Sequence, residues 1–223
     1  IGLSLVGSEM CIRDRNRRMS KLKVNNLSCQ KGYNLLFENL SFEINSGDVL
    51  KISGPNGSGK TSLLRIIAGL SSFESGEIHY DSYKLNSEQY KLDFLYLGHL
   101  ASLSPELSCI ENLRYSSLLD ANDLNNDHSM ALKQVGLEKY ENDLVGTLSA
   151  GQKKRIALSL LFITSSKVWL LDEPFSALDS KAIKIFENKI EDHCKQGGIC
   201  ILTTHQKCNI NNCLLYTSDA ADD

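Results

Sequence analysis

The body of the chain begins with short runs in which apolar and polar residues alternate. This period-two pattern predicts two antiparallel strands, Lys21–Cys29 and Leu40–Ile44, with a turn at Lys31–Asn34. Short apolar or aromatic runs predict five further strands, which are Val49–Ile52, Glu77–Tyr80, Leu92–Leu97, Val168–Leu171 and Ile199–Thr203.

Helical segments alternate with the later strands and are expected at Ser62–Ala68, Ile156–Ile163 and Ser180–Lys195. Between about residues 100 and 150 the pattern changes to short helices in Asn/Asp-rich surroundings, and these are Ile110–Leu119, His128–Val135 and Glu138–Tyr140. Alternation of strands and helices favours a doubly wound sheet. We therefore predict an α/β fold with a mostly parallel core sheet, an N-terminal antiparallel β subdomain and an inserted helical subdomain.

The two ends of the chain differ from this body. Residues 1–18 show neither helical nor strand periodicity, and Met19 directly precedes the first strand pattern. The segments Ser4–Arg15 and Cys213–Asp223 resemble translated sequencing-adapter read-through. We therefore expect one domain over residues 19–212, with 1–18 and 213–223 as non-native or poorly packed flanks.

Composition narrows the class of function without choosing one. Of the 223 residues, 42% are hydrophobic and 23% are charged, as is ordinary for a globular protein. The formal net charge of −3 does not suggest a nucleic-acid partner. No apolar run approaches the roughly 18 residues of a membrane span, so a role at a membrane would require a partner. The seven cysteines form no CxxC pair, which favours reduced thiols.

The segment Gly54–Thr61 matches the phosphate-binding pattern GxxxxGK[ST] at every position. Its residues are Gly54, Pro55, Asn56, Gly57, Ser58, Gly59, Lys60 and Thr61, and Ser62 follows in the expected helix. Glycines let successive backbone N–H groups point at phosphate oxygens, and a helix N-terminus favours an anion. Lys60 is predicted to reach the β- and γ-phosphates of a nucleoside triphosphate, and Thr61 to place its hydroxyl on Mg²⁺.

A second apolar strand, Val168–Leu171, leads directly into two acids, Asp172 and Glu173. These acids fall at the carboxyl end of a buried strand, where α/β proteins bind ligands. Asp172 is predicted to hold Mg²⁺, directly or through water. Glu173 is predicted to act as the general base that polarises an attacking water molecule.

The segment Leu148–Gln152, LSAGQ, precedes a helix with a basic first turn. Ser149 has a free hydroxyl, and Ala150 and Gly151 have almost no side chain, so backbone N–H groups here can approach a phosphate. At this point the chain resembles the ATP-binding cassette ATPases, whose signature sequence is LSGGQ. Ala150 stands in place of the first glycine, and Gln152 ends the motif. The resemblance covers nearly all of residues 19–206.

The resemblance implies further roles. The nucleotide would be ATP, and hydrolysis would need Mg²⁺. The segment Ser176–Asp179 resembles the D-loop that follows the catalytic acid, and His205 resembles the switch histidine that contacts the γ-phosphate. Tyr33 is the candidate for the aromatic residue that stacks on adenine. In the family, two cassettes close head to tail, so Ser149 and Gly151 of one copy would meet the γ-phosphate held by the other.

One position narrows the family. Cassette ATPases usually carry a glutamine at the junction into the helical subdomain, where it helps to hold Mg²⁺, and here that position is His99. A neutral imidazole can still bind a metal-bound water molecule. With LSAGQ, Leu171–Phe175 (LDEPF) and Gly197–Gln206 (GGICILTTHQ), the Gly-His junction resembles the ATP-binding subunits of cytochrome c maturation (Ccm) haem-export complexes.

This closer resemblance implies an ATPase attached to an integral membrane subunit, peripheral on the cytoplasmic face of the inner membrane. Hydrolysis would drive release of a haem-loaded chaperone, and haem itself is not expected to bind this chain. The surface from Leu100 to Leu113 is expected to contact the membrane subunit, because it follows His99.

Other functions stay open at this point. The chain could serve another transporter, which the Gly-His junction disfavours. It could be a soluble cassette ATPase of iron–sulfur assembly or translation, although translation factors of this type carry two cassettes. A P-loop kinase is the third alternative, and the segments around Ser149 and His205 argue against it.

Overall fold

The computed structural model describes residues 20–99, 102–117, 127–206, 208–211 and 213–217. The strands are β1 (Lys21–Lys31), β2 (Asn34–Asn45), β3 (Val49–Ser53), β4 (Ser75–Tyr80), β5 (Tyr83–Lys84), β6 (Phe94–Leu97), β7 (Val168–Asp172), β8 (Ile199–Thr203) and β9 (Cys213–Thr217). The α-helices are α1 (Lys60–Ile67), α2 (Glu88–Leu92), α3 (Cys109–Ser117), α4 (His128–Gln134), α5 (Ala150–Ser159) and α6 (Ser180–Lys195). The 3₁₀ helices are η1 (Glu138–Tyr140), η2 (Val145–Thr147) and η3 (Leu160–Phe162).

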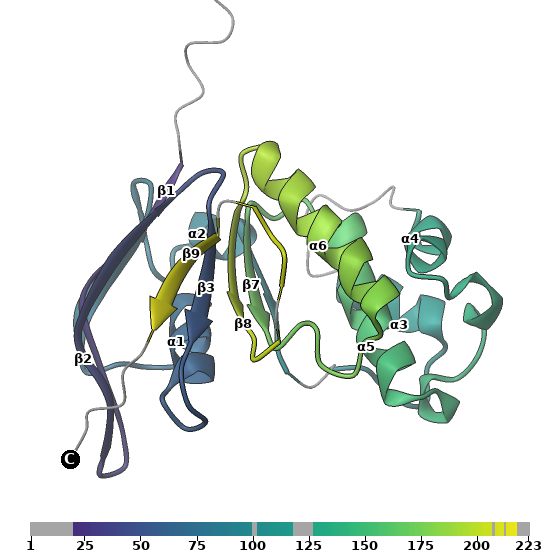
Figure 1. The fold of residues 1–223 in the computed structure, drawn as a ribbon, viewed down its shortest axis with the longest axis horizontal. Helices are drawn as coiled ribbons and strands as arrows, with labels where there is room; N and C mark the ends of the chain where they lie inside the picture. The colour runs from purple at the N-terminus through teal and green to yellow at the C-terminus, as the bar shows by residue number, and fades with distance from the viewer. Residues whose placement is uncertain (1–19, 100–101, 118–126, 207, 212, 218–223) are drawn as a thin grey trace, which may run out of the picture.

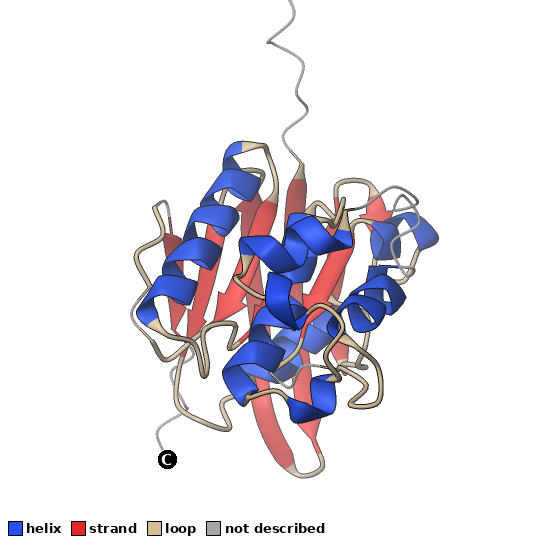
Figure 2. Ribbon diagram, turned by 90° about the vertical axis from the view of Figure 1, so that its right-hand side faces the viewer, coloured by secondary structure: helices blue, strands red, loops and turns tan. Residues whose placement is uncertain are grey.

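Two sheets form the strand-rich part of the molecule. The antiparallel sheet has the order β2-β1-β4-β5, and the other sheet has the order β6-β7-β8-β3-β9 with every neighbouring pair parallel. In Figure 1 the antiparallel sheet lies on the left, the parallel sheet in the middle and the helices α3 to α6 on the right. Figure 2 shows these helices in front of the strands. The predicted α/β fold class is confirmed.

Alternate residues of the central strands pack on opposite faces of the parallel sheet. On β7, Val168 and Leu170 belong to a core that also contains Leu64 and Ile67 of α1 and buried residues of the antiparallel sheet. Trp169 and Leu171 belong to a second core on the other face, shared with α6 and the helical subdomain. A strand that is apolar on both faces is typical of a covered parallel sheet. Because β7 is packed on both faces, its position is fixed, and so is the position of the two acids at its end.

Several elements differ from the sequence-based expectation. The helix expected at Ile156 begins at Ala150, because Ser149 and Gln152 form a capping box. In this box Gln152 N–H donates to Ser149 Oγ at 3.3 Å, and Ser149 N–H donates to Gln152 Oε1 at 2.9 Å. Strand β2 begins at Asn34 instead of Leu40, and α2 was not expected.

The flanks are described only in part. Residues 1–18 and 218–223 lie outside the described residues. Within the C-terminal flank, Cys213–Thr217 form β9 and pair in parallel with β3, and the expectation of a non-native or poorly packed flank stays a prediction. An unpaired edge offers a row of backbone hydrogen-bonding groups that an extended segment can satisfy. Leu214 and Leu215 nevertheless remain 47% and 64% exposed.

Candidate functional site

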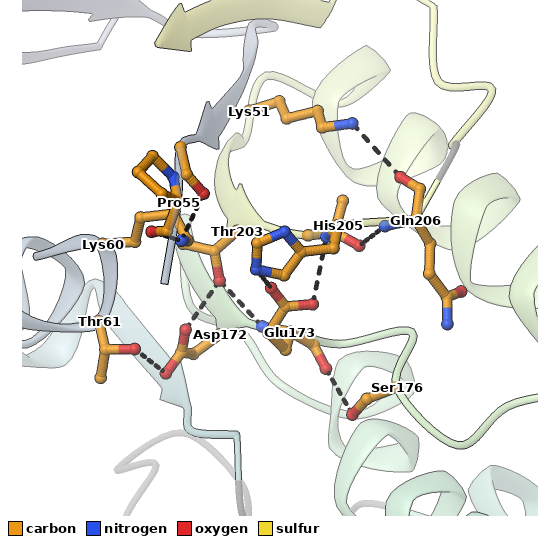
Figure 3. Close-up of polar contacts among 12 residues, drawn as sticks. Lys51, Pro55, Lys60, Thr61, Asp172, Glu173, Ser176, Thr203, His205 and Gln206 are labelled. Carbon is orange, nitrogen blue, oxygen red and sulfur yellow. Dashed lines mark hydrogen bonds and ion pairs between the residues drawn. The ribbon is translucent and has the colours of Figure 1, made fainter. Parts of the chain in front are cut away.

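The phosphate loop runs between β3 and α1, and its glycines allow the turn. Gly59 is the N-cap of α1 with a φ of 87°, a left-handed conformation that residues with a Cβ atom rarely adopt. Lys60 Nζ donates hydrogen bonds to the carbonyl oxygens of Gly54 at 2.8 Å and Pro55 at 2.7 Å (Figure 3). The ammonium group therefore lies against the loop itself, next to any phosphate that the loop would bind.

Asp172 lies at the meeting point of α1, β7 and β8. It is 2% exposed. Thr61 Oγ1 donates to its Oδ2 at 2.9 Å, and Thr203 Oγ1 donates to its Oδ1 at 2.7 Å (Figure 3). Asp172 and Thr203 are direct partners in the β7–β8 register, which explains why the second hydroxyl reaches it. Both carboxylate oxygens are thus held in place by hydroxyl groups.

This donor set fits Mg²⁺. Hydroxyl and carboxylate oxygens are the hard ligands that Mg²⁺ prefers, usually one or two from the protein with water and phosphate completing the shell. The hydroxyl of Thr61 and one carboxylate oxygen of Asp172 lie side by side at the start of α1, where the phosphate loop ends. These two residues are the ones that would hold the ion.

Glu173 follows Asp172 in a strained backbone conformation. Its φ is 47°, which is uncommon for a residue other than glycine and costs about 1 kcal/mol or more. Its N–H donates to Thr203 Oγ1 at 3.0 Å and to Thr203 O at 3.2 Å. Strand β8 therefore holds the peptide of Glu173 in this conformation. Strain of this kind is characteristic of functional sites.

The carboxylate of Glu173 faces His205. Glu173 Oε1 lies 3.5 Å from His205 Nε2, and its Oε2 accepts from His205 N–H at 3.4 Å. The side chain of Glu173 is 19% exposed and that of His205 is 52% exposed. Within the described part of the chain, Oε1 is buried without a hydrogen-bond partner. A buried carboxylate oxygen with spare accepting capacity beside a phosphate loop is suited to accept a proton from water.

The signature segment lies around a separate pocket. A cavity of about 440 Å³ is lined by Gly136, Leu137, Tyr140, Ser149, Gly151, Gln152, Arg155, Ala177 and Asp179. Of the described residues that line it, none belongs to the phosphate loop. Ser149 and Ala150 are exposed. The structure therefore brings Lys60, Thr61, Asp172, Glu173 and His205 together, and gathers Ser149, Gly151, Gln152 and Asp179 elsewhere.

The signature segment packs closely on the D-loop. A Cβ atom at Gly151 would lie 2.7 Å from Ala177 O, so no larger residue fits without a shift of backbone. Arg155 Nη2 donates to Asp179 Oδ2 at 2.7 Å, and Asp179 Oδ1 accepts from Ala182 N–H at 2.7 Å as the N-cap of α6. The Ala182 amide, and secondarily Arg155, hold the pKa of Asp179 below its ordinary value.

His99 follows β6 and has an exposed side chain. Its described contact is through the backbone, where its carbonyl oxygen accepts a hydrogen bond from Lys154 Nζ at 3.1 Å. The role of its imidazole at a metal-bound water stays a prediction.

Tyr33 lies at the tip of the β1–β2 hairpin and is fully exposed. The hairpin residues that contact the phosphate loop are Leu36 and Phe37. A Cβ atom at Gly59 would lie 3.1 Å from Leu36 Cβ and 3.3 Å from Phe37 Cδ1. Stacking of Tyr33 on adenine stays a prediction, and Phe37 is a second aromatic residue at this place.

Sequence reasoning missed two residues of the site, Thr203 and Lys154. Thr203 orients both acids, and Lys154 binds the backbone at His99. For Thr203 a weak signal exists, because it ends a strand just before His205. For Lys154 there was none beyond its place in the basic first turn after the signature.

Known proteins match this chain in sequence and in fold. The family model described as ABC transporter matches residues 37–176. The cytochrome c biogenesis ATP-binding export protein CcmA of Shewanella frigidimarina is 44% identical over 197 residues, covering 87% of this chain and 91% of that protein. CcmA of Haemophilus influenzae is 45% identical over 190 residues, covering 84% and 90%.

A solved structure shares the fold. An ATP-binding cassette solved as a dimer in a post-hydrolysis state with ADP and Pi has a TM-score of 0.73 and 24% identity, covering 83% of this chain and 88% of that one. The family resemblance predicted from the motifs is confirmed. The chain belongs to the ABC transporter family, as one of its ATP-binding cassettes.

Proposed function

We propose that this chain is the ATP-hydrolysing subunit of a membrane export complex for cytochrome c biogenesis. The observation that carries the proposal is the identity to CcmA export proteins along most of both chains. Lys60, Asp172 and Glu173 lie near the carboxyl ends of the parallel strands. This arrangement supports the part of the proposal that concerns ATP hydrolysis. The reaction is ATP plus water to ADP plus phosphate.

Each residue of the site has a distinct role in this reaction. Lys60 exchanges its carbonyl contacts for β- and γ-phosphate oxygens. Thr61 and Asp172 hold Mg²⁺, which when bound neutralises developing charge on the phosphates. Glu173 accepts a proton from the water molecule that attacks the γ-phosphorus, and His205 contacts the γ-phosphate and keeps the Glu173 carboxylate in place.

The signature residues serve a second copy of the chain. Ser149 is exposed at the N-terminus of α5, and the dipole of a helix favours an anion at this end. Its pocket contains no described residue of its own phosphate loop. We therefore assign Ser149 and Gly151 to the γ-phosphate bound by the partner copy, so that the active form is a homodimer with two shared sites.

An apolar groove beside β6 is the place for the membrane subunit. Its volume is about 760 Å³, and it includes Leu97, Gly98 and Leu103 near His99. Leu70, Leu92 and Tyr115 in its lining are 55%, 44% and 69% exposed. Exposed apolar patches of this kind mark interaction sites. Residues 102–113 of the expected contact surface fall within the described residues, whereas residues 100–101 do not.

The location follows from this assembly. Within the described residues, no helix has the length and apolar character needed to cross a membrane. We place the chain at the cytoplasmic face of the inner membrane through its membrane subunit. It supplies energy to the complex without binding haem, and the released species is the haem-loaded chaperone.

Complementation tests the proposal. In a bacterium whose own gene for this subunit is deleted, the chain should restore covalent haem attachment to c-type cytochromes, measured by haem staining of denatured proteins. Glu173→Gln should not restore it. Glu38→Gln, at an exposed carboxylate on β2, is the matched control and should restore it.

The outcomes separate the alternatives. A chain that hydrolyses ATP in vitro but does not restore haem attachment would be the ATPase of another transporter. Restoration by Glu173→Gln would show that haem attachment does not require ATP hydrolysis at this site.

A further inference from the structure

Lys154 is a buried lysine that joins separate segments of the site. It is 6% exposed and stands on α5, five residues after Ser149. Its Nζ donates to the carbonyl oxygens of His99 at 3.1 Å and Gly98 at 3.5 Å. Lysine is rarely buried without partners, because desolvation of its charge is costly. Its partners here are the backbone at the entry to the helical subdomain.

The same ammonium group lies in the field of the two acids of the site. Burial lowers the pKa of Lys154, whereas the carboxylates of Asp172 and Glu173 oppose that shift. The hydrogen bonds of Lys154 Nζ go to the carbonyl groups of Gly98 and His99, so its hydrogen-bond partners lie at the entry to the helical subdomain.

Helix α5 begins at the signature segment. The capping box between Ser149 and Gln152 fixes its first turn, and Gly151 packs on Ala177. Five residues of α-helix span about 7.5 Å, so Ser149 and Lys154 move as one body. A displacement of the signature segment would therefore also displace the backbone carbonyl groups that Lys154 binds.

We propose that Lys154 is a positioning residue for hydrolysis, which fixes the peptide of His99 to the start of α5. This inference rests on the proposed function, since it assumes that Ser149 contacts the nucleotide of the partner copy. When that contact forms, Lys154 moves with α5 and carries the His99 peptide with it.

The test is steady-state hydrolysis by the full chain with Mg²⁺ and ATP. Lys154→Met removes the charge and the donors at similar length, and we expect kcat to fall at least about tenfold with KM for ATP within about twofold of wild type. Lys154→Arg keeps charge and donors and should restore kcat to within about threefold of wild type. Lys154→Gln serves as a second neutral variant if Lys154→Met does not fold.

Lys189→Met is the matched control. Lys189 is also partly buried, its pKa is also lowered by burial, and its Nζ lies 5.2 Å from the centre of the Phe162 ring. A purely structural role would make the two Met variants alike in thermal unfolding and in kcat. We expect only Lys154→Met to lose kcat.

A kcat of Lys154→Met within twofold of wild type would overturn the inference alone. Absence of hydrolysis by wild type would overturn the proposed function and the inference with it.

Discussion

The phosphate-loop site and the signature site differ in how much of their chemistry one chain supplies. At the phosphate loop, α1, β7 and β8 bring Thr61 and Thr203 within hydrogen-bonding distance of Asp172. At the signature, Ser149 is exposed at a helix N-terminus, and its side chain caps its own helix. The first site has its acids and lysine already in place, whereas the second presents donors outward. In the proposed homodimer, each shared site would combine the phosphate-loop part of one copy with the signature part of the other.

The largest effect is expected at the phosphate-loop site. Glu173→Gln keeps the shape of the side chain and removes the base, so kcat should fall by about 100- to 1,000-fold while ATP binding persists. ATP should then favour the dimer, because the bound nucleotide is not consumed. Phosphate release and analytical ultracentrifugation with ATP measure the two effects. Near-normal hydrolysis would reject Glu173 as the base.

The signature site should fail in a different way. Ser149→Arg places a bulky side chain at the start of α5, and we expect the homodimer to lose at least about tenfold in kcat. In mixed dimers that carry Ser149→Arg in one copy and Glu173→Gln in the other, the two changes fall on the same shared site. The remaining site should stay active. Two inactive sites in this mixed dimer, measured as no phosphate release, would argue against sharing.

Thr203 tests how far orientation matters at the first site. Thr203→Val removes the hydroxyl that donates to Asp172 and accepts from the Glu173 N–H. A lost hydrogen bond to a buried charged group costs about 1–3 kcal/mol, so we expect a fall in kcat of roughly tenfold and a higher Mg²⁺ requirement. Thr203→Ser keeps the hydroxyl and should behave as wild type. An unchanged Mg²⁺ titration for Thr203→Val would contradict this role.

The smallest effect is a pH dependence at the signature side. The pKa of Asp179 is lower in the folded chain, so its contribution to stability is present above its ordinary pKa of about 3.9 and is lost as the pH falls through the folded value. The temperature of thermal unfolding should therefore fall less steeply with decreasing pH for Asp179→Asn than for wild type. Equal declines would show that Asp179 does not contribute.

Local sequence patterns predicted those parts of the site that are formed by residues close together in the sequence. The phosphate loop and the acids after β7 were found because glycine spacing and an apolar strand before two carboxylates are contained in short segments. The start of α5 was placed six residues late, although Ser149 and Gln152 have the spacing of a capping box. The segment was expected to lie just before a helix with a basic first turn, and the capping box shows that the helix includes Ala150 and Gly151 as well.

Contacts between distant segments could not be predicted in the same way. Thr203 meets Asp172 through the parallel register of β7 and β8, although the two residues are 31 positions apart in sequence. Lys154 Nζ donates to the carbonyl oxygen of His99, which stands 55 positions earlier in the sequence. The register of a parallel pair is set by packing on both faces of the sheet, and it cannot be predicted from one sequence alone.

Strand β6 is one of the two edge strands of the parallel sheet, and the apolar groove lies directly beside it. A sheet edge next to exposed leucine and tyrosine side chains is a template for aggregation unless something covers it. A preparation of this chain alone should therefore lose soluble material with time and concentration. Co-production with the membrane subunit should give a higher yield of monodisperse protein.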